Sequence, residues 1–227
     1  MDRFKRYGLY VVPDGAFYDA GAAWLGWDSV AGRAVPQPRV AGLDAVRDMT
    51  ATPGKYGFHG TIKPPFRLVA GQTAQTLDAA ARSFCTSQPP VVIPEIEVRL
   101  LGRFVAVVCK TPSDALARLA GATVRALDPF RAPAPPDELQ KRRAKGLSPR
   151  QDALLTQWGY PYVMEEFRFH LTLTGSLPKD SAEHARTALA SHFAPHLPRP
   201  YVIDSLALMG EAEDGFFHLV HRYTLSG

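Results

Sequence analysis

Cysteine is scarce in this chain, and long apolar runs are absent. Its 227 residues include only Cys85 and Cys109, which show neither a C-x-x-C spacing nor another metal-ligand spacing. A disulfide framework and a zinc knuckle are therefore not indicated. No apolar run approaches the length of a membrane span, and the one before Pro13 is shorter than the core of a signal peptide. We therefore expect a protein of the reducing cytoplasm with no membrane partner.

Several motifs that mark common enzyme classes are also missing. The sequence has no Gly-rich phosphate loop, no dinucleotide fingerprint and no nucleophile elbow, so nucleoside triphosphate hydrolysis and serine esterase chemistry lack support. His192 and His196 stand four positions apart, but Pro195 would break a helix there and no glutamate completes a zinc motif. The sequence therefore indicates neither a metal nor a cofactor.

The charge and composition are those of an ordinary globular protein. Lys and Arg number 26 against 22 Asp and Glu, which gives a formal net charge of +4. The sequence pI of about 9.1 favours anionic partners without requiring a polyanion. With 46% hydrophobic and 21% charged residues, the chain can form one large domain or two lobes that share a core. We treat residues 1–227 as one bilobal domain.

Strand and helix patterns alternate along the chain. Helices are predicted at 15–26, 73–87, 113–127 and 181–193, with Ser113 as an N-cap, and two short polar helices within 137–159. Strands are predicted at 6–13, 57–66, 91–100, 103–110, 167–175, 201–210 and 216–225. The last two strands are joined by a short turn, which implies antiparallel pairing and an α+β fold. A basic helical insertion is expected at about 129–166.

One five-residue pattern occurs twice, more than a hundred positions apart. Residues 58–62 read FHGTI and residues 169–173 read FHLTL. Side chains alternate across a strand, so His59, Thr61 and Lys63 are expected on one face of the first copy. In the second copy Arg168, His170 and Thr172 are expected to share a face. Each strand then offers an imidazole and a hydroxyl, about 7 Å apart along the strand, to one tetrahedral anion.

The pair of matches carries more weight than either match alone. Chance predicts roughly 0.01 such five-residue matches per chain of this composition. A single copy is adequately explained as a half-buried strand with a hydrogen-bonded histidine. The order strand, helix, strand, strand is predicted after both His59 and His170, which indicates an old duplication although the flanking sequences differ.

The paired motifs resemble those of the 2H phosphoesterases, which carry an H-x-[ST]-aliphatic motif in each lobe. The stretches YGFHGTIKPPFRL and FRFHLTLTGSL, with RYGLYVVP near the start, look like the branch encoded beside bacterial phosphonate-degradation operons. The resemblance implies two pseudo-twofold-related lobes of antiparallel sheet, with helices outside and a central cleft. It also implies metal-independent hydrolysis of a cyclic phosphodiester on a small phosphorylated sugar or nucleotide. His59 and His170 would then exchange protons, and Thr61 and Thr172 would donate hydrogen bonds to phosphate oxygens.

Four further residues are candidates for substrate binding. Lys63 and Arg168 have the strand parity to add positive charge at the same anion, and the alternative for each is an ordinary surface cation. Tyr7 and Tyr10 lie on the first predicted strand and could stack on a sugar or base. The alternative for both tyrosines is that they only pack.

Two other functions use the same site. An RNA 2′,3′-cyclic phosphodiesterase would need a groove for the chain, and the basic run KRRAKGLSPRQ at 141–151 could follow a phosphate backbone. That run lacks the aromatic residues that stack on bases, so a solvated helical face is favoured and RNA is the less favoured substrate. The third interpretation is a non-catalytic module that binds a phosphorylated ligand. The sequence does not define an oligomeric state.

Overall fold

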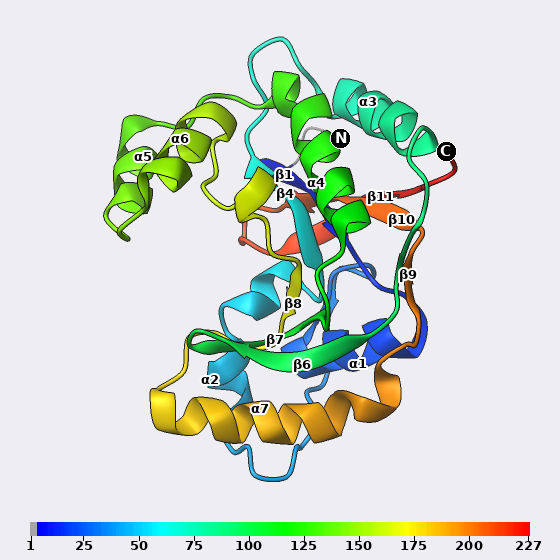
Figure 1. Ribbon diagram of the computed structural model, residues 1–227, viewed down its shortest axis with the longest axis vertical. Helices are drawn as coiled ribbons and strands as arrows, with labels where there is room; N and C mark the ends of the chain where they lie inside the picture. The colour runs from blue at the N-terminus through cyan, green and yellow to red at the C-terminus, as the bar shows by residue number, and fades with distance from the viewer. Residues whose placement is uncertain (1–3) are drawn as a thin grey trace.

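Seven strands form one antiparallel sheet (Figure 1). The computed structural model describes residues 4–227. The strands lie in the order β11-β10-β1-β4-β8-β7-β6. Their bounds are Arg6–Val11 (β1), Gly60–Phe66 (β4), Ile96–Leu101 (β6), Phe104–Cys109 (β7), His170–Thr172 (β8), Ser205–Glu211 (β10) and Phe217–Thr224 (β11). Two short antiparallel pairs complete the strands: Trp27–Asp28 (β2) with Arg33–Ala34 (β3), and Val91–Ile93 (β5) with Tyr201–Ile203 (β9).

Helices surround the sheet, and side chains cap several of them. Their bounds are Gly15–Leu25 (α1), Val46–Thr50 (α2), Ala74–Thr86 (α3), Asp114–Ala126 (α4), Pro136–Arg143 (α5), Pro149–Trp158 (α6) and Lys179–Phe193 (α7). Ser113 caps α4 as predicted, because its hydroxyl accepts a hydrogen bond from the Leu116 amide. Thr73 and Ser148 begin α3 and α6 with capping boxes. Helices α5 and α6 project from one side of the molecule (Figure 1).

The two halves of the chain contain the same order of elements, and a helix of each half packs on strands of the other half. Strand β4 is followed by α3, β5, β6 and β7, and β8 is followed by α7, β9, β10 and β11. Helix α3 packs on the β10–β11 hairpin of the second half, whereas α7 packs on the β6–β7 hairpin of the first half. In Figure 1 these two helices lie at opposite ends of the molecule, with the sheet between them. Each half therefore completes the core of the other.

The phenylalanines of the repeated motif hold the central strands in place. Phe58 is fully buried, and its ring lies where a Cβ on Gly21 of α1 would be. Phe169 fills the corresponding space above Gly60, where an added Cβ would be 2.3 Å from the ring. Close approach of an aromatic ring thus requires glycine at both positions. These contacts bury one face of the strands and leave the histidines and threonines on the other face.

The predicted α+β class with antiparallel pairing is confirmed, and several boundaries differ. Pro94 divides the strand expected at 91–100 into β5 and β6, since proline cannot donate a hydrogen bond to a neighbouring strand. The strand expected at 167–175 spans only His170–Thr172. The segment after α1, for which we predicted no strand, contains β2 and β3. Within residues 4–227 no helix is both long and apolar enough to cross a membrane.

Candidate active site

The two motifs meet where β4 crosses β8. Gly60 lies opposite Leu171 in an antiparallel register. This register places Thr61 opposite His170 and His59 opposite Thr172, because residues on either side of an antiparallel pair also face each other. All four side chains point to the same face of the sheet, since they are one position away from the buried Gly60 and Leu171. An imidazole on one strand therefore faces a hydroxyl on the other at two places, His170 with Thr61 and His59 with Thr172.

His59 is held in one tautomer by the backbone. Its Nδ1 lies 2.9 Å from the carbonyl oxygen of Gly57, which can only accept, so Nδ1 carries the proton in the neutral ring. Nε2 then accepts from the Thr61 hydroxyl at 3.1 Å. The Tyr10 ring stacks on the imidazole with centroids 3.9 Å apart. Burial lowers the pKa of His59 to about 4, the Gly57 carbonyl partly opposes this, and His170 lowers the pKa further.

His170 repeats this arrangement on β8. Its Nδ1 donates to the carbonyl oxygen of Arg168, two residues upstream, at 2.7 Å. Nε2 is thereby the nitrogen available for proton transfer, as in His59. Burial lowers the pKa of His170, and the Arg168 carbonyl acts in the opposite direction. Both shifts favour the neutral form of the motif histidines.

A cavity of about 310 Å³ opens next to this crossing. Thr61 and His170 line it directly, and His59 reaches it through its contact with Thr61. The remaining lining residues come from β4, the β6–β7 hairpin and the segment that precedes β8: Ile62, Pro64, Leu101, Phe104, Tyr160, Tyr162, Glu166, Phe167 and Arg168. Thr172 is half-buried on the same face of the sheet as His59. The cavity can admit a small ligand to both motifs.

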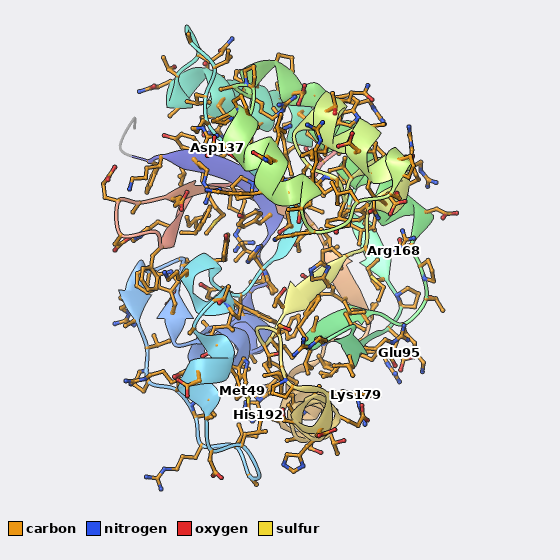
Figure 2. The ribbon with its side chains drawn as sticks, turned by 90° about the vertical axis from the view of Figure 1, so that its left-hand side faces the viewer. Met49, Glu95, Asp137, Arg168, Lys179 and His192 are labelled. Carbon is orange, nitrogen blue, oxygen red and sulfur yellow. The ribbon has the colours of Figure 1, made fainter. Side chains whose placement is uncertain are left out.

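Arg168 lies at the cavity as its strand parity predicts. Its Nη1 donates to the carbonyl oxygens of Glu165 and Phe167, and within residues 4–227 no carboxylate lies at ion-pair distance from it. In Figure 2 it lies between the upper part of the molecule, where Asp137 is on α5, and α7 below, which carries Lys179 and His192. Its guanidinium is exposed and can contribute positive charge for an anionic ligand.

Lys63 does not share the face of His59 and Thr61, so the expectation from strand alternation is wrong. The pairing of β1 with β4 shifts register, so that Thr61 faces Tyr10 while Lys63 faces Leu9 on the opposite side. Lys63 is 2% exposed, and its Nζ donates to the Val124 carbonyl at 3.3 Å and lies 3.5 Å from an oxygen of Asp128. Burial lowers the pKa of Lys63 to about 8, and Asp128 partly offsets the effect. Lys63 is absent from the cavity lining.

The two tyrosines of β1 lie on opposite faces of the strand. Tyr7 is buried with its ring edge-on to Phe4. We considered it as a residue that could stack on the substrate, but it does not line the cavity. Tyr10 is fully buried beneath His59, where it positions the imidazole. Its hydroxyl has no hydrogen-bond partner among residues 4–227, and burial raises its pKa well above the ordinary value. Tyr10 therefore contacts His59 and does not line the cavity.

Three lining residues with polar groups were not singled out from the sequence. Tyr160, Tyr162 and Glu166 come from the segment between α6 and β8, where the chain reads WGYPYVMEEF. Two tyrosines around a proline, shortly before the second motif, were the available signal. Within the described part of the chain, no group of three or more potential metal-ligating side chains occurs.

A family model described as a protein of unknown function, DUF1045, matches residues 61–218. The chain is 39% identical over 222 residues to the ribose 1,5-bisphosphate phosphokinase PhnN of Janthinobacterium sp. (strain Marseille), covering 94% of this chain and 49% of the relative. It is 34% identical over 213 residues to the protein of the same name from Laribacter hongkongensis (strain HLHK9), covering 92% and 49%. The chain thus spans about half the length of the curated relatives it matches.

Solved structures are more distant. Escherichia coli LigT complexed with 3′-AMP is 15% identical, with a TM-score of 0.45 and 99% of each chain covered. TT0787 of Thermus thermophilus is 13% identical, with a TM-score of 0.47 and 98% of each chain covered. Both TM-scores are below 0.5, so the α+β architecture stands on the strand topology of this chain.

Proposed function

The chain belongs to the DUF1045 family of proteins of unknown function, and we propose that it is a 2H-type phosphoesterase that hydrolyses a cyclic phosphodiester on a small phosphorylated sugar or nucleotide without a metal. The observation that carries the proposal is the register of Gly60 with Leu171, which directs both H-x-T motifs to one face beside one cavity. Two imidazoles that each present Nε2, with a hydroxyl beside each, suit proton transfer at a phosphate group.

In the proposed reaction His59 acts as the base and His170 as the acid. The Nε2 atom of His59 takes a proton from water, whose oxygen attacks phosphorus. The ester oxygen then leaves with the proton from Nε2 of His170, which must enter the reaction protonated. Thr172 and Arg168 donate hydrogen bonds to the non-bridging oxygens, where negative charge accumulates, and the Thr61 hydroxyl joins them when it turns from Nε2 of His59 to the bound phosphate. The low pKa of His59 supports its role as the base.

Bound phosphate is expected to make the protonation states of the two histidines differ. Burial lowers the pKa of both rings. A phosphate anion within a few ångströms favours the protonated form of a neighbouring imidazole. His170 lines the cavity directly, and the Arg168 carbonyl at its Nδ1 also favours the protonated ring, so it is the ring that we expect to be protonated when substrate binds.

The names of the relatives support a ribose phosphate as the substrate class. Both relatives are named for a reaction on ribose 1,5-bisphosphate and are about twice as long as this chain. A cyclic phosphate on such a sugar has the phosphodiester that the proposed chemistry requires. We place the activity in phosphonate catabolism, in line with the operon-encoded branch that the motifs resemble.

RNA remains the second candidate substrate, and the charge pattern of α5 and α6 disfavours it. Four of the five cations in the basic run have carboxylate partners: Lys141 with Asp137, Arg142 with Glu138, Arg143 with Asp152 and Arg150 with Glu165. Cations that are already paired release fewer counterions on binding a phosphate backbone. A steep salt dependence of binding to a cyclic-phosphate-ended RNA would favour this alternative.

Turnover of a small panel of substrates in EDTA tests the proposal. The panel comprises ribose 1,2-cyclic phosphate, 2′,3′-cyclic nucleotides and a cyclic-phosphate-ended RNA. We expect wild type to hydrolyse at least one of them, and His59→Ala and His170→Ala each to lose about 100-fold to 10,000-fold in kcat, the usual contribution of one acid or base. His184→Ala on α7 should keep full activity and controls for the loss of a histidine, because His184 contacts the Gly42 carbonyl and does not line the cavity.

The variants also separate the acid from the base. A substrate with a good leaving group, such as a p-nitrophenyl phosphodiester, needs no proton on its leaving oxygen, so it should restore His170→Ala more than His59→Ala. Equal restoration would overturn the assignment of roles. Tight binding of a cyclic phosphate without turnover would instead indicate the non-catalytic binding module.

A further inference from the structure

The cavity has two chemically different sides. Thr61, His170 and Arg168 form the side where the phosphate is proposed to bind. A second wall comes from residues 160–166, at the end of the insertion that the sequence predicts at about 129–166. This wall presents two phenol rings and a carboxylate. A ligand that fills the cavity must therefore offer the wall something other than a second anionic group.

Glu166 is the residue of this wall that would repel an anionic group of the ligand. One of its oxygens accepts a hydrogen bond from Nε2 of Gln151 at 3.0 Å, and no cation of residues 4–227 lies within ion-pair distance of it. Its neighbour Glu165 is paired with Arg150 at the surface. Met164, at φ 54°, takes a backbone conformation that costs energy for a residue other than glycine, and it directly precedes the two glutamates.

A carboxylate in a phosphate-binding cavity is explained by hydroxyl groups on the ligand. An ionised carboxylate only accepts hydrogen bonds and has about four lone-pair sites, so it can accept from two adjacent hydroxyls at once. Such charge-assisted bonds are stronger than neutral ones. A hydroxyl-bearing ring next to the phosphate provides these donors and keeps the two negative charges apart.

The tyrosines supply a flat apolar surface for the same ring. Tyr162 is 46% exposed and meets Tyr160 edge-on, with centroids 5.7 Å apart. Tyr160 is fixed by the Arg142 guanidinium, 5.1 Å from its ring centre. An exposed ring backed by a fixed one can pack on the C–H face of a sugar while its hydroxyl stays polar. The 310 Å³ of the cavity is at the small end of ligand sites, which suits one sugar ring with its phosphate.

We propose that Glu166 and Tyr162 select the substrate by its sugar, with Glu166 accepting hydrogen bonds from ring hydroxyls and Tyr162 packing on the ring. The insertion is then the specificity element of the site. This inference rests on the proposed function for the phosphate half of the ligand.

Selectivity between two cyclic phosphodiesters tests the proposal. Ribose 1,2-cyclic phosphate carries free hydroxyls, whereas the cyclic phosphate of ethylene glycol has none. We expect Glu166→Gln to lower the ratio of kcat/KM for the sugar over the glycol compound by about 10-fold to 100-fold, as for loss of a hydrogen bond to a charged group. Tyr162→Ala should lower the same ratio. Glu165→Gln makes the same chemical change one position away on a surface ion pair and should leave the ratio at the wild-type value.

Calorimetric binding gives a second readout that does not depend on turnover. Ribose 5-phosphate should bind more weakly to Glu166→Gln than to wild type, whereas inorganic phosphate should bind equally or more tightly, since a negative charge has been removed. Changes in the same direction for both ligands, or an unchanged ratio in the kinetic test, would overturn the sugar assignment. If wild type hydrolyses neither cyclic compound, the proposed function fails and the opposite binding shifts still decide the role of Glu166.

Discussion

Both motif histidines donate Nδ1–H to the carbonyl oxygen two residues upstream, so both rings hold the same tautomer. The residues around the two rings differ more than the rings themselves. Tyr10 stacks on His59, whereas His170 has Phe104 at 5.6 Å and lies on the cavity. The Tyr10 ring packs beneath His59, and burial of the imidazole between this ring and its neighbours lowers its pKa.

The low pKa of His59 predicts a loss of stability in mild acid. Because its pKa is about 4 when folded and near 6.5 when unfolded, the unfolded chain binds the proton more readily. The free energy of unfolding should therefore be highest above about pH 6.5 and fall as the pH drops toward 4, with this one residue contributing on the order of 2 kcal/mol by pH 5. Urea unfolding at pH 7.5 and 5.0 measures the effect.

His59→Asn is the matched variant, because the amide can still donate to Gly57 and cannot take up a proton. It should lose less stability than wild type between the two pH values. An identical loss in both proteins would show that His59 is not responsible.

Lys63 and Arg168 should respond differently to substitution. Lys63→Met removes a buried charge but leaves Asp128 bound by Arg131 at 2.7 and 3.2 Å. We expect kcat/KM within about threefold of wild type and a change in unfolding free energy within about 1.5 kcal/mol. Arg168→Ala removes a cation from the cavity and should cost tenfold or more in kcat/KM. Steady-state kinetics of the two variants, side by side, would contradict this if Lys63→Met were the more damaged enzyme.

At the scale of elements, the crossing of β4 and β8 depends on the small residue between His59 and Thr61. Only glycine fits at position 60, because the Phe169 ring occupies the space that a side chain would need. The second motif has Leu171 at the equivalent position, where the side chain fills the core instead. The two motifs therefore share their polar face and differ on the buried one.

Gly60→Ala should strain this crossing. A methyl group would lie 2.3 Å from the Phe169 ring, and overpacking of this kind costs about 1 to 3 kcal/mol. Because the strain falls between His59 and Thr61, activity should fall together with stability. Adding Phe169→Leu should recover part of both losses, which thermal melts and kinetics of the four proteins of the cycle would measure. Additive losses in the double variant would contradict a direct contact.

Strand alternation within a single motif was sufficient to predict which residues share the catalytic face. His59 with Thr61, and His170 with Thr172, are separated by two positions with no irregularity between them. Lys63 could not be placed in this way, because the shift arises from how β4 pairs with β1 and not from β4 alone. The wall formed by Tyr160, Tyr162 and Glu166 was equally hidden, since contacts of Arg142 and Gln151 fold that segment back onto the cavity.

At the scale of the whole molecule, the exchanged packing of α3 and α7 makes the two halves depend on each other. One hydrophobic core joins residues of both halves, from Tyr7 near the start to Leu225 near the end. We expect a single unfolding transition in which far-UV circular dichroism, near-UV circular dichroism and enzymatic activity change together. Separate transitions for these probes would show that each half is stable alone.

The site lies on the local twofold axis between Gly60 and Leu171, and this has a consequence for the direction of the reaction. A phosphate group also has twofold symmetry, so two mirrored Nε2 atoms can receive it in either of two orientations related by a half turn. In one orientation His59 faces the attacking water, and in the other it faces the leaving oxygen. Of the two motif histidines, only His170 lines the cavity together with Tyr160, Tyr162 and Glu166 of the insertion. Under the proposed function, we therefore expect the insertion to decide which orientation a substrate adopts, although it carries none of the proposed catalytic groups.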